Sequence, residues 1–180
     1  MNTIPILELV STIVVNATTG KLVAKDRFVI NTNPGAPVKI SCLGDNFNAW
    51  FLNGDSKTKC PISEQTLRYH ELRQSSVDGP IITELGGEAK AETTLSEMFS
   101  LMEKQKHGED GVLLNNGWAN IFYIKDVAGV LRAVHVSWGD DGWCVYAHSV
   151  ERPRSGGDGY QVFSRNSVLE SSETSAPAQA

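Results

Sequence analysis

Two alternating segments joined by a glycine-aspartate turn constrain the fold of this chain most strongly. Apolar and polar residues alternate from Val130 to Trp138, and they alternate again from Trp143 to Val150. The intervening residues, Gly139 to Gly142, read Gly-Asp-Asp-Gly, a composition typical of tight turns. We therefore predict an antiparallel hairpin with a four-residue loop, in which Trp138 lies opposite Trp143.

This pairing gives the hairpin an apolar face and a polar face. Valines and tryptophans share the first face, and the second carries Ser137, His135, Tyr146, Cys144 and His148. Directly opposite residues of antiparallel strands lie ~4.5–5.5 Å apart, and diagonal neighbours lie ~7–8 Å apart. His135 should therefore lie opposite Tyr146, with Cys144 and His148 on its two diagonals.

The polar face has a catalytic and a structural interpretation. A cysteine becomes nucleophilic near neutral pH when a base or cation stabilises its thiolate, and His135 or His148 could do so for Cys144. The structural alternative is packing, because every strand has a second face and cysteine is commonly a small buried hydrophobe. No local motif of a thiol protease surrounds Cys144.

The hairpin tip is a candidate binding surface. Trp138 and Trp143 could anchor a partner protein, since tryptophan is over-represented among interface hot spots. Asp140 and Asp141 would then add negative charge at the tip. The alternative for both tryptophans is a place in the core, where aromatic cross-strand pairs stabilise sheets.

Other chemical motifs are missing from the sequence. Cysteines and histidines occur, but in none of the spacings C-x-x-C, H-x-x-x-H or H-E-x-x-H that mark zinc sites. The glycine pairs Gly86-Gly87 and Gly156-Gly157 match neither dinucleotide-binding nor Walker A patterns. We expect no metal and no cofactor.

Length and composition set the broad class. The 180 residues suit one domain, which we place at residues 1–169 with a possible subdivision near residue 110, followed by a disordered tail at 170–180. A net charge of −5 argues against nucleic-acid binding, and no apolar run is long enough for a membrane span. Three scattered cysteines suggest a reducing compartment, so we expect a cytoplasmic protein.

Helical signals are strongest between Thr94 and Lys106. Thr94-Leu-Ser-Glu97 matches a capping box, and large apolar residues follow at helical spacing. This segment is predicted to be the longest helix and to pack on a sheet. A short helix is predicted over residues 45–54.

The remaining N-terminal half predicts mostly strands. We expect a hairpin of Ile4–Val15 with Leu22–Asn31, a strand at Val38–Leu43 and a short strand at Pro80–Leu85. Ser63–Gln74 has an acidic residue near its beginning and a basic residue near its end, as suits the dipole of a helix. Its apolar residues form no clean stripe, so the segment could be a helix or a strand.

Strands outnumber helices without regular alternation, which favours the α+β class. We predict an antiparallel sheet with a C-terminal β-meander of four strands (118–125, 130–138, 143–150 and 160–164), one long packing helix and one or two short helices. The absence of catalytic motifs favours a non-catalytic protein-interaction module whose partner is another protein. A thiol-dependent enzyme centred on Cys144 and a structural or assembly subunit are the alternatives.

Overall fold

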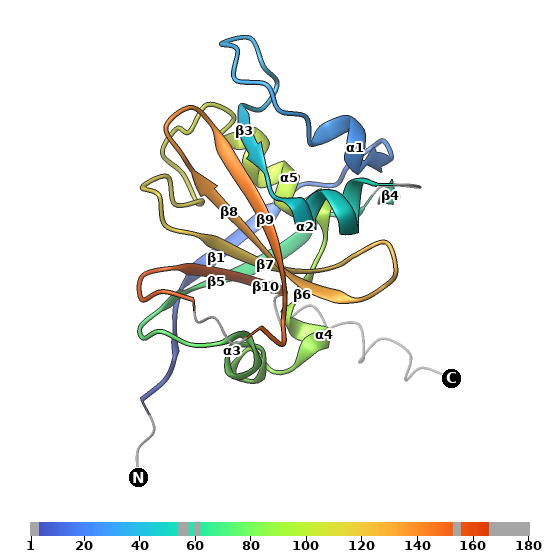
Figure 1. Ribbon diagram of the computed structural model, residues 1–180. Helices are drawn as coiled ribbons and strands as arrows, with labels where there is room; N and C mark the ends of the chain where they lie inside the picture. The colour runs from blue at the N-terminus through green and yellow to red at the C-terminus, as the bar shows by residue number, and fades with distance from the viewer. Residues whose placement is uncertain (1–3, 54–57, 60–61, 153–155, 166–180) are drawn as a thin grey trace, which may run out of the picture.

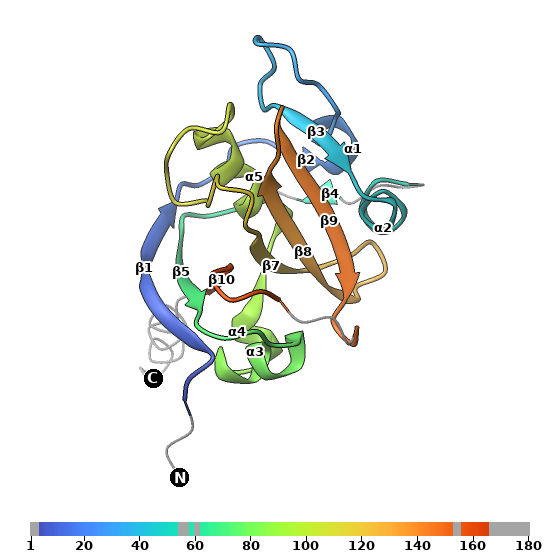
Figure 2. The same cartoon turned by 60° about the vertical axis from the view of Figure 1, so that its left-hand side comes forward.

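The computed structural model describes residues 4–53, 58–59, 62–152 and 156–165. It contains a sheet of eight strands, seven of which lie side by side, while the eighth, β6 (Glu92–Thr93), pairs beside β7. Figures 1 and 2 show β1 at one end of this sheet and β3 at the other. From edge to edge the seven strands are β1 (Leu7–Val15), β5 (Gln65–Leu72), β10 (Gln161–Arg165), β7 (Asn120–Lys125), β8 (Leu131–Trp138), β9 (Trp143–Ser149) and β3 (Ile40–Leu43).

The molecule belongs to the α+β class, but its sheet is mixed, whereas the sequence predicted an antiparallel one. Four neighbouring pairs are antiparallel: β1–β5, β5–β10, β7–β8 and β8–β9. Three pairs are parallel: β10–β7, β3–β9 and β6–β7. Parallel pairing joins segments that are distant in sequence, so no local turn signal reveals it.

The predicted four-strand meander is wrong in its last strand. Strands β7, β8 and β9 follow one another as antiparallel neighbours. The next strand, β10, does not continue beside β9. It crosses to the other side of β7 and fills the space between β5 and β7, so strands from both sides of residue 110 belong to one sheet.

Helices and loops cover both faces of the sheet (Figure 1). One face packs against α5 (Leu95–Lys104), α2 (Asp45–Phe47) and the residues around α1 (Ala24–Arg27), and it forms the larger apolar core. The other face packs against α3 (Asp78–Glu84) and α4 (Glu88–Ala91) in a smaller core. A separate two-stranded sheet pairs β2 (Leu22–Val23) with β4 (Thr58–Lys59).

Helix α5 begins with the capping box that the sequence indicates. The hydroxyl oxygen of Thr94 accepts a hydrogen bond from the amide of Glu97, and Glu97 accepts one from the amide of Thr94. Leu95, Met98 and Met102 are fully buried in the larger core. At ten residues, α5 ends two residues before the expected Lys106.

Four predicted segments of the N-terminal half have a different or a more detailed structure. The hairpin of 4–15 with 22–31 is wrong, because β1 pairs with β5 and the chain after β2 turns into α1. Residues 80–85 lie largely in α3, where Pro80 occupies the first turn that proline tolerates. Residues 63–74, left open by the sequence, contain β5. The helix expected at 45–54 occurs as α2 followed by the π-helical turn η1 (Asn48–Leu52).

The predicted disordered tail at 170–180 lies outside the described residues. Among the described helices, none has the length and apolar character needed to cross a membrane.

Candidate functional site

The β8–β9 hairpin forms in the predicted register. Trp138 pairs with Trp143, Val136 with Val145 and His135 with Tyr146. The amide of Gly139 donates to the carbonyl of Gly142 at 2.9 Å and closes the four-residue loop. The alternation of the sequence was sufficient to predict this register because a one-residue slip would move the buried valines to the other face.

The two tryptophans of the hairpin have different surroundings. Trp143 is fully buried, and its ring nitrogen donates to the carbonyl of Gln105 at 2.8 Å. In this structure its side chain is therefore part of the core. Trp138 is partly buried, stacks edge-on against Trp143 at 5.1 Å, and lies over Gly108, where a Cβ atom would collide with its ring. Asp140 and Asp141 are exposed at the tip.

Cys144 is joined by a disulfide bond to Cys42. The two residues are register partners on the parallel strands β9 and β3, with their Cα atoms 4.6 Å apart. The Oγ atom of Ser41 lies 3.3 Å from the sulfur of Cys144, and the Tyr146 hydroxyl lies 3.0 Å from the sulfur of Cys42. Sequence reasoning, which took the three scattered cysteines as a sign of a reducing compartment, did not predict this bond.

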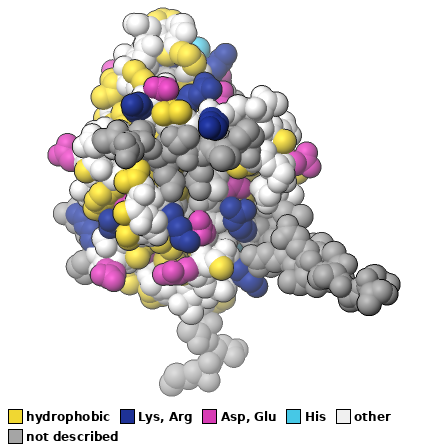
Figure 3. Space-filling model, turned by 90° about the vertical axis from the view of Figure 1, so that its right-hand side faces the viewer, with side chains coloured by type: hydrophobic (Ala, Val, Ile, Leu, Met, Phe, Trp, Pro, Cys, Tyr) yellow, Lys and Arg dark blue, Asp and Glu magenta, His cyan; other side chains and the backbone are white. Residues whose placement is uncertain are grey.

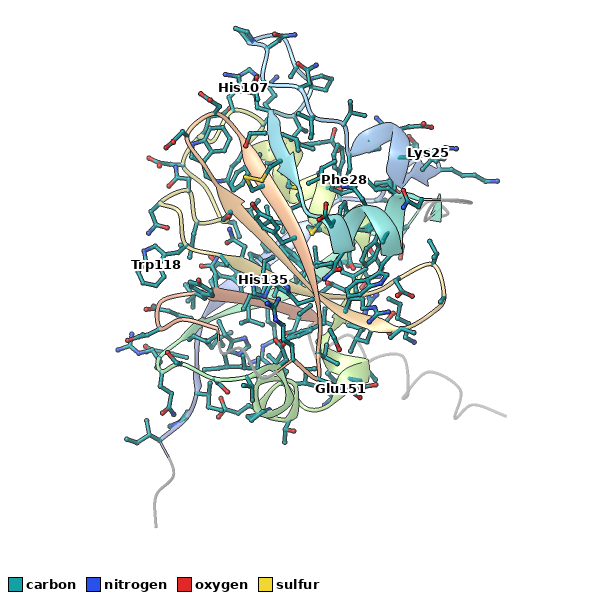
Figure 4. All side chains as sticks on the ribbon, viewed as in Figure 1. Lys25, Phe28, His107, Trp118, His135 and Glu151 are labelled. Atoms are coloured by element: carbon teal, nitrogen blue, oxygen red, sulfur yellow. A yellow bond between two sulfur atoms is a disulfide. The ribbon has the colours of Figure 1, made fainter. Side chains whose placement is uncertain are left out.

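The two histidines of the polar face contact each other. The rings of His135 and His148 meet edge-to-face, with centroids 4.9 Å apart, as their diagonal register predicts. Nη1 of Arg152 lies 2.6 Å from Nδ1 of His148, so that nitrogen accepts a hydrogen bond from the guanidinium group. Figure 4 shows His135 well inside the outline of the molecule.

Electrostatics keeps His135 neutral. Burial, followed by the nearby His148 and Arg152, lowers the pKa of His135 to about 3. A histidine with so low a pKa is a weak base and carries no charge near neutral pH, so it neither accepts the proton of a thiol readily nor stabilises a thiolate by its charge. The sulfur of Cys144 contacts Ser41 and Cys42, and no hydrogen bond joins it to either histidine in the described residues. In this structure the sulfur of Cys144 is therefore held in a disulfide and is not a thiolate.

Sequence reasoning did not select three further residues near this face, two of them aromatic and one basic. Tyr160 lies edge-to-face between His135, at 6.4 Å, and Trp118, at 5.6 Å. Trp118 is 44% exposed and lies at the edge of the molecule in Figure 4. Arg152 contacts this group of residues through its hydrogen bond to His148. Tyr160 comes after the connection that follows β9. Only the tertiary fold therefore places it beside His135 of the hairpin.

Metal binding finds no support in the described part of the chain. No group of three or more His, Cys, Asp or Glu side chains there is arranged to hold a metal ion. The polar face offers a disulfide, a neutral histidine and a histidine bonded to arginine, none of which favours a cation.

The outer edge of β1 is a second candidate surface. β1 ends the sheet, and no described strand pairs with its outer side. Leu9, Val10 and Val14 are 48%, 50% and 44% exposed there. The carboxylate of Glu84 on α3 accepts hydrogen bonds of 2.8 Å from the amides of Ile6 and Leu7, which anchors the beginning of this strand.

The valines and isoleucines of Ile4–Val15 suggested a strand, but sequence reasoning gave this strand a hairpin partner at residues 22–31 that would have covered one edge. Among the residues that the structure describes, β1 pairs only with β5, and none pairs with its outer edge. The chain matches no protein-family model, and it is similar to no curated protein and no solved structure with which it was compared.

Proposed function

We propose that this protein is a non-catalytic interaction module that pairs with a second copy of itself along the outer edge of β1. The supporting observation is a nine-residue edge strand that exposes Leu9, Val10 and Val14 to solvent. Unpaired amide and carbonyl groups on a sheet edge are a template for another strand, and apolar side chains beside them add burial on pairing.

The composition of β1 supports a second copy as the partner. From Leu9 to Val15 the strand reads Leu-Val-Ser-Thr-Ile-Val-Val, without a charge or a proline. Natural edge strands are usually protected by charged residues, prolines or short length. An antiparallel pair of identical strands around a two-fold axis sets this uncharged segment against itself, so no charge repulsion opposes the contact, even in a chain of net charge −5.

Two features of β1 limit where the second copy can pair. A register shift between Leu9 and Ser11 makes Val10 a bulge, and bulges interrupt a ladder. Ser11–Val15 is regular and offers the better edge. The Nζ atom of Lys104 lies 3.4 Å from the carbonyl oxygen of Val14, a long contact that a strand partner can replace.

The test is the molar mass of the purified full chain over a concentration series, measured by analytical ultracentrifugation. We expect a reversible dimer for the wild type and a monomer for Val14→Lys. Val127→Lys is the matched control, because Val127 is 48% exposed outside the strands and its substitution should leave the dimer intact. A wild-type monomer throughout, or equal behaviour of the two variants, would refute the proposal.

Ionic strength separates this interface from binding at the hairpin tip. Because the paired residues Leu9–Val15 carry no charge, a β1 contact should change its dissociation constant little when salt is added. An association through Asp140 and Asp141, which are exposed, should weaken as salt screens their charge. Strong weakening of the wild-type dimer by salt would therefore point to the tip and contradict pairing at β1.

A further inference from the structure

A polar pocket of about 260 Å³ lies between the loop before β2 and helix α5. Ser96, Ser100 and Glu103 of α5 line it, and so do Lys21 from the loop before β2 and Arg27 from α1. The pocket is smaller than the sites that hold drug-sized molecules, which span roughly 300–1,000 Å³. Its size therefore suits a small metabolite.

The lining of the pocket is locally positive. Lys21 and Arg27 make no ion pair with any residue that the structure describes. Glu103 is the single carboxylate among the described lining residues, so the cations exceed it by one. This balance runs against the net charge of −5 for the whole chain. Figure 3 shows the side of the molecule that carries α1, where Lys and Arg side chains are interspersed with Asp and Glu.

Ser96 adds a hydroxyl group to the lining of the pocket. It lies in the first turn of α5 and is only 2% exposed. Its backbone carbonyl accepts a hydrogen bond from the Ser100 hydroxyl at 2.8 Å. The first turn of a helix also favours negative charge.

We propose that this pocket binds the phosphate group of a small phosphomonoester. Lys21 and Arg27 neutralise the phosphate, and the Ser96 hydroxyl donates to one of its oxygens. The remainder of the ligand extends past Arg27 into an adjoining hollow of about 120 Å³. That hollow shares Arg27, Phe99 and Glu103 with the pocket. It adds the polar residues Asp26 and Asn31 and the apolar residues Val29, Pro37 and Val38, so it suits a short body that carries hydroxyl groups. This site is independent of pairing at β1.

The experiment is isothermal titration calorimetry of the full chain with three probes: inorganic phosphate, glycerol 3-phosphate and glycerol. We expect saturable binding of glycerol 3-phosphate, weaker binding of phosphate and none of glycerol. Stronger or equal binding of inorganic phosphate would overturn the phosphomonoester and leave a free-phosphate site. No saturable binding of either anion would overturn the site itself.

Three variants connect the binding to this pocket. Arg27→Gln and Ser96→Ala should each weaken glycerol 3-phosphate binding, the former by about tenfold or more because it loses a charge-assisted contact. Lys25→Gln is the matched control, since Lys25 belongs to the same short helix, is exposed and does not line the pocket. Figure 4 shows Lys25 directed away from the molecule. Equal affinities for all variants with native circular dichroism spectra would refute the assignment.

Discussion

Cys42 and Cys144 lie opposite each other on the parallel strands β3 and β9, and a disulfide bond joins them. They are 102 residues apart in sequence, so the bond closes most of the chain into one loop. β3 has four residues and forms an edge of the sheet, with only an isolated bridge from Asn31 to Ile40 on its other side. The covalent bond therefore ties a short edge strand to the centre of the fold.

Reduction of this bond should destabilise the protein. Closing a long loop restricts the unfolded chain, and native disulfides typically contribute about 2–4 kcal/mol. We expect the free energy of unfolding in urea to fall by this amount for Cys42→Ser, or for the wild type with a reductant. Cys60→Ser is the control and should behave as the wild type. Alkylation of all three cysteines without a reductant would contradict the bond.

The stability of the protein should depend on pH through His135. Its pKa is lowered to about 3, whereas an unfolded histidine titrates near 6.5. Between these values the unfolded chain binds more protons than the folded one, so stability is lost as the pH falls from about 6.5 towards 3. We expect the loss between pH 7 and 5 to be about 1–2 kcal/mol smaller in His135→Gln than in the wild type.

The exposed His107 supplies the control for this measurement. His107→Gln should retain the pH dependence of the wild type in urea unfolding. If His135→Gln and His107→Gln gave the same profile, His135 would not be the group responsible.

Truncation of the buried face of α5 should be costly. Met98 is fully buried and Phe99 is 5% exposed, both within the larger core. Met98→Ala or Phe99→Ala should lower the free energy of unfolding by about 2–5 kcal/mol, because each leaves a cavity. Glu103→Ala, on the exposed side of the same helix, should change it little. If both substitutions lowered the free energy of unfolding by less than about 1 kcal/mol, this face of α5 would not be packed in the core.

Asp126 should be important for the turn between β7 and β8. One carboxylate oxygen accepts from the amides of Ala128 and Val130, and the other accepts from Nε of Arg132 at 2.8 Å. Asp126→Ala should cost about 1.5–3 kcal/mol in urea unfolding, as expected for hydrogen bonds to a charged group. Asp126→Asn keeps an oxygen for the two amides and should cost less. A larger loss for asparagine than for alanine would contradict this assignment.

The sequence by itself determined the local elements in which one physical signal dominates. The alternation from Val134 to Trp138 and the turn chemistry determined the register of β8 with β9, because a slip would move Val136 and Val145 to the other face. The capping box determined where α5 begins, because Thr94 and Glu97 satisfy each other's amides without help from the rest of the fold. The edge-to-face contact of His135 with His148 followed from the same register.

Only the tertiary structure decided which distant segments lie together. Nothing local indicates that β10 passes to the far side of β7 or that β3 lies parallel to β9, since parallel neighbours are joined by long connections and not by recognisable turns. The disulfide of Cys42 with Cys144, the return of Tyr160 to His135 and the unpaired edge of β1 all depend on that topology. The pocket between Arg27 and Ser96 likewise exists only where α5 packs beside the loop before β2.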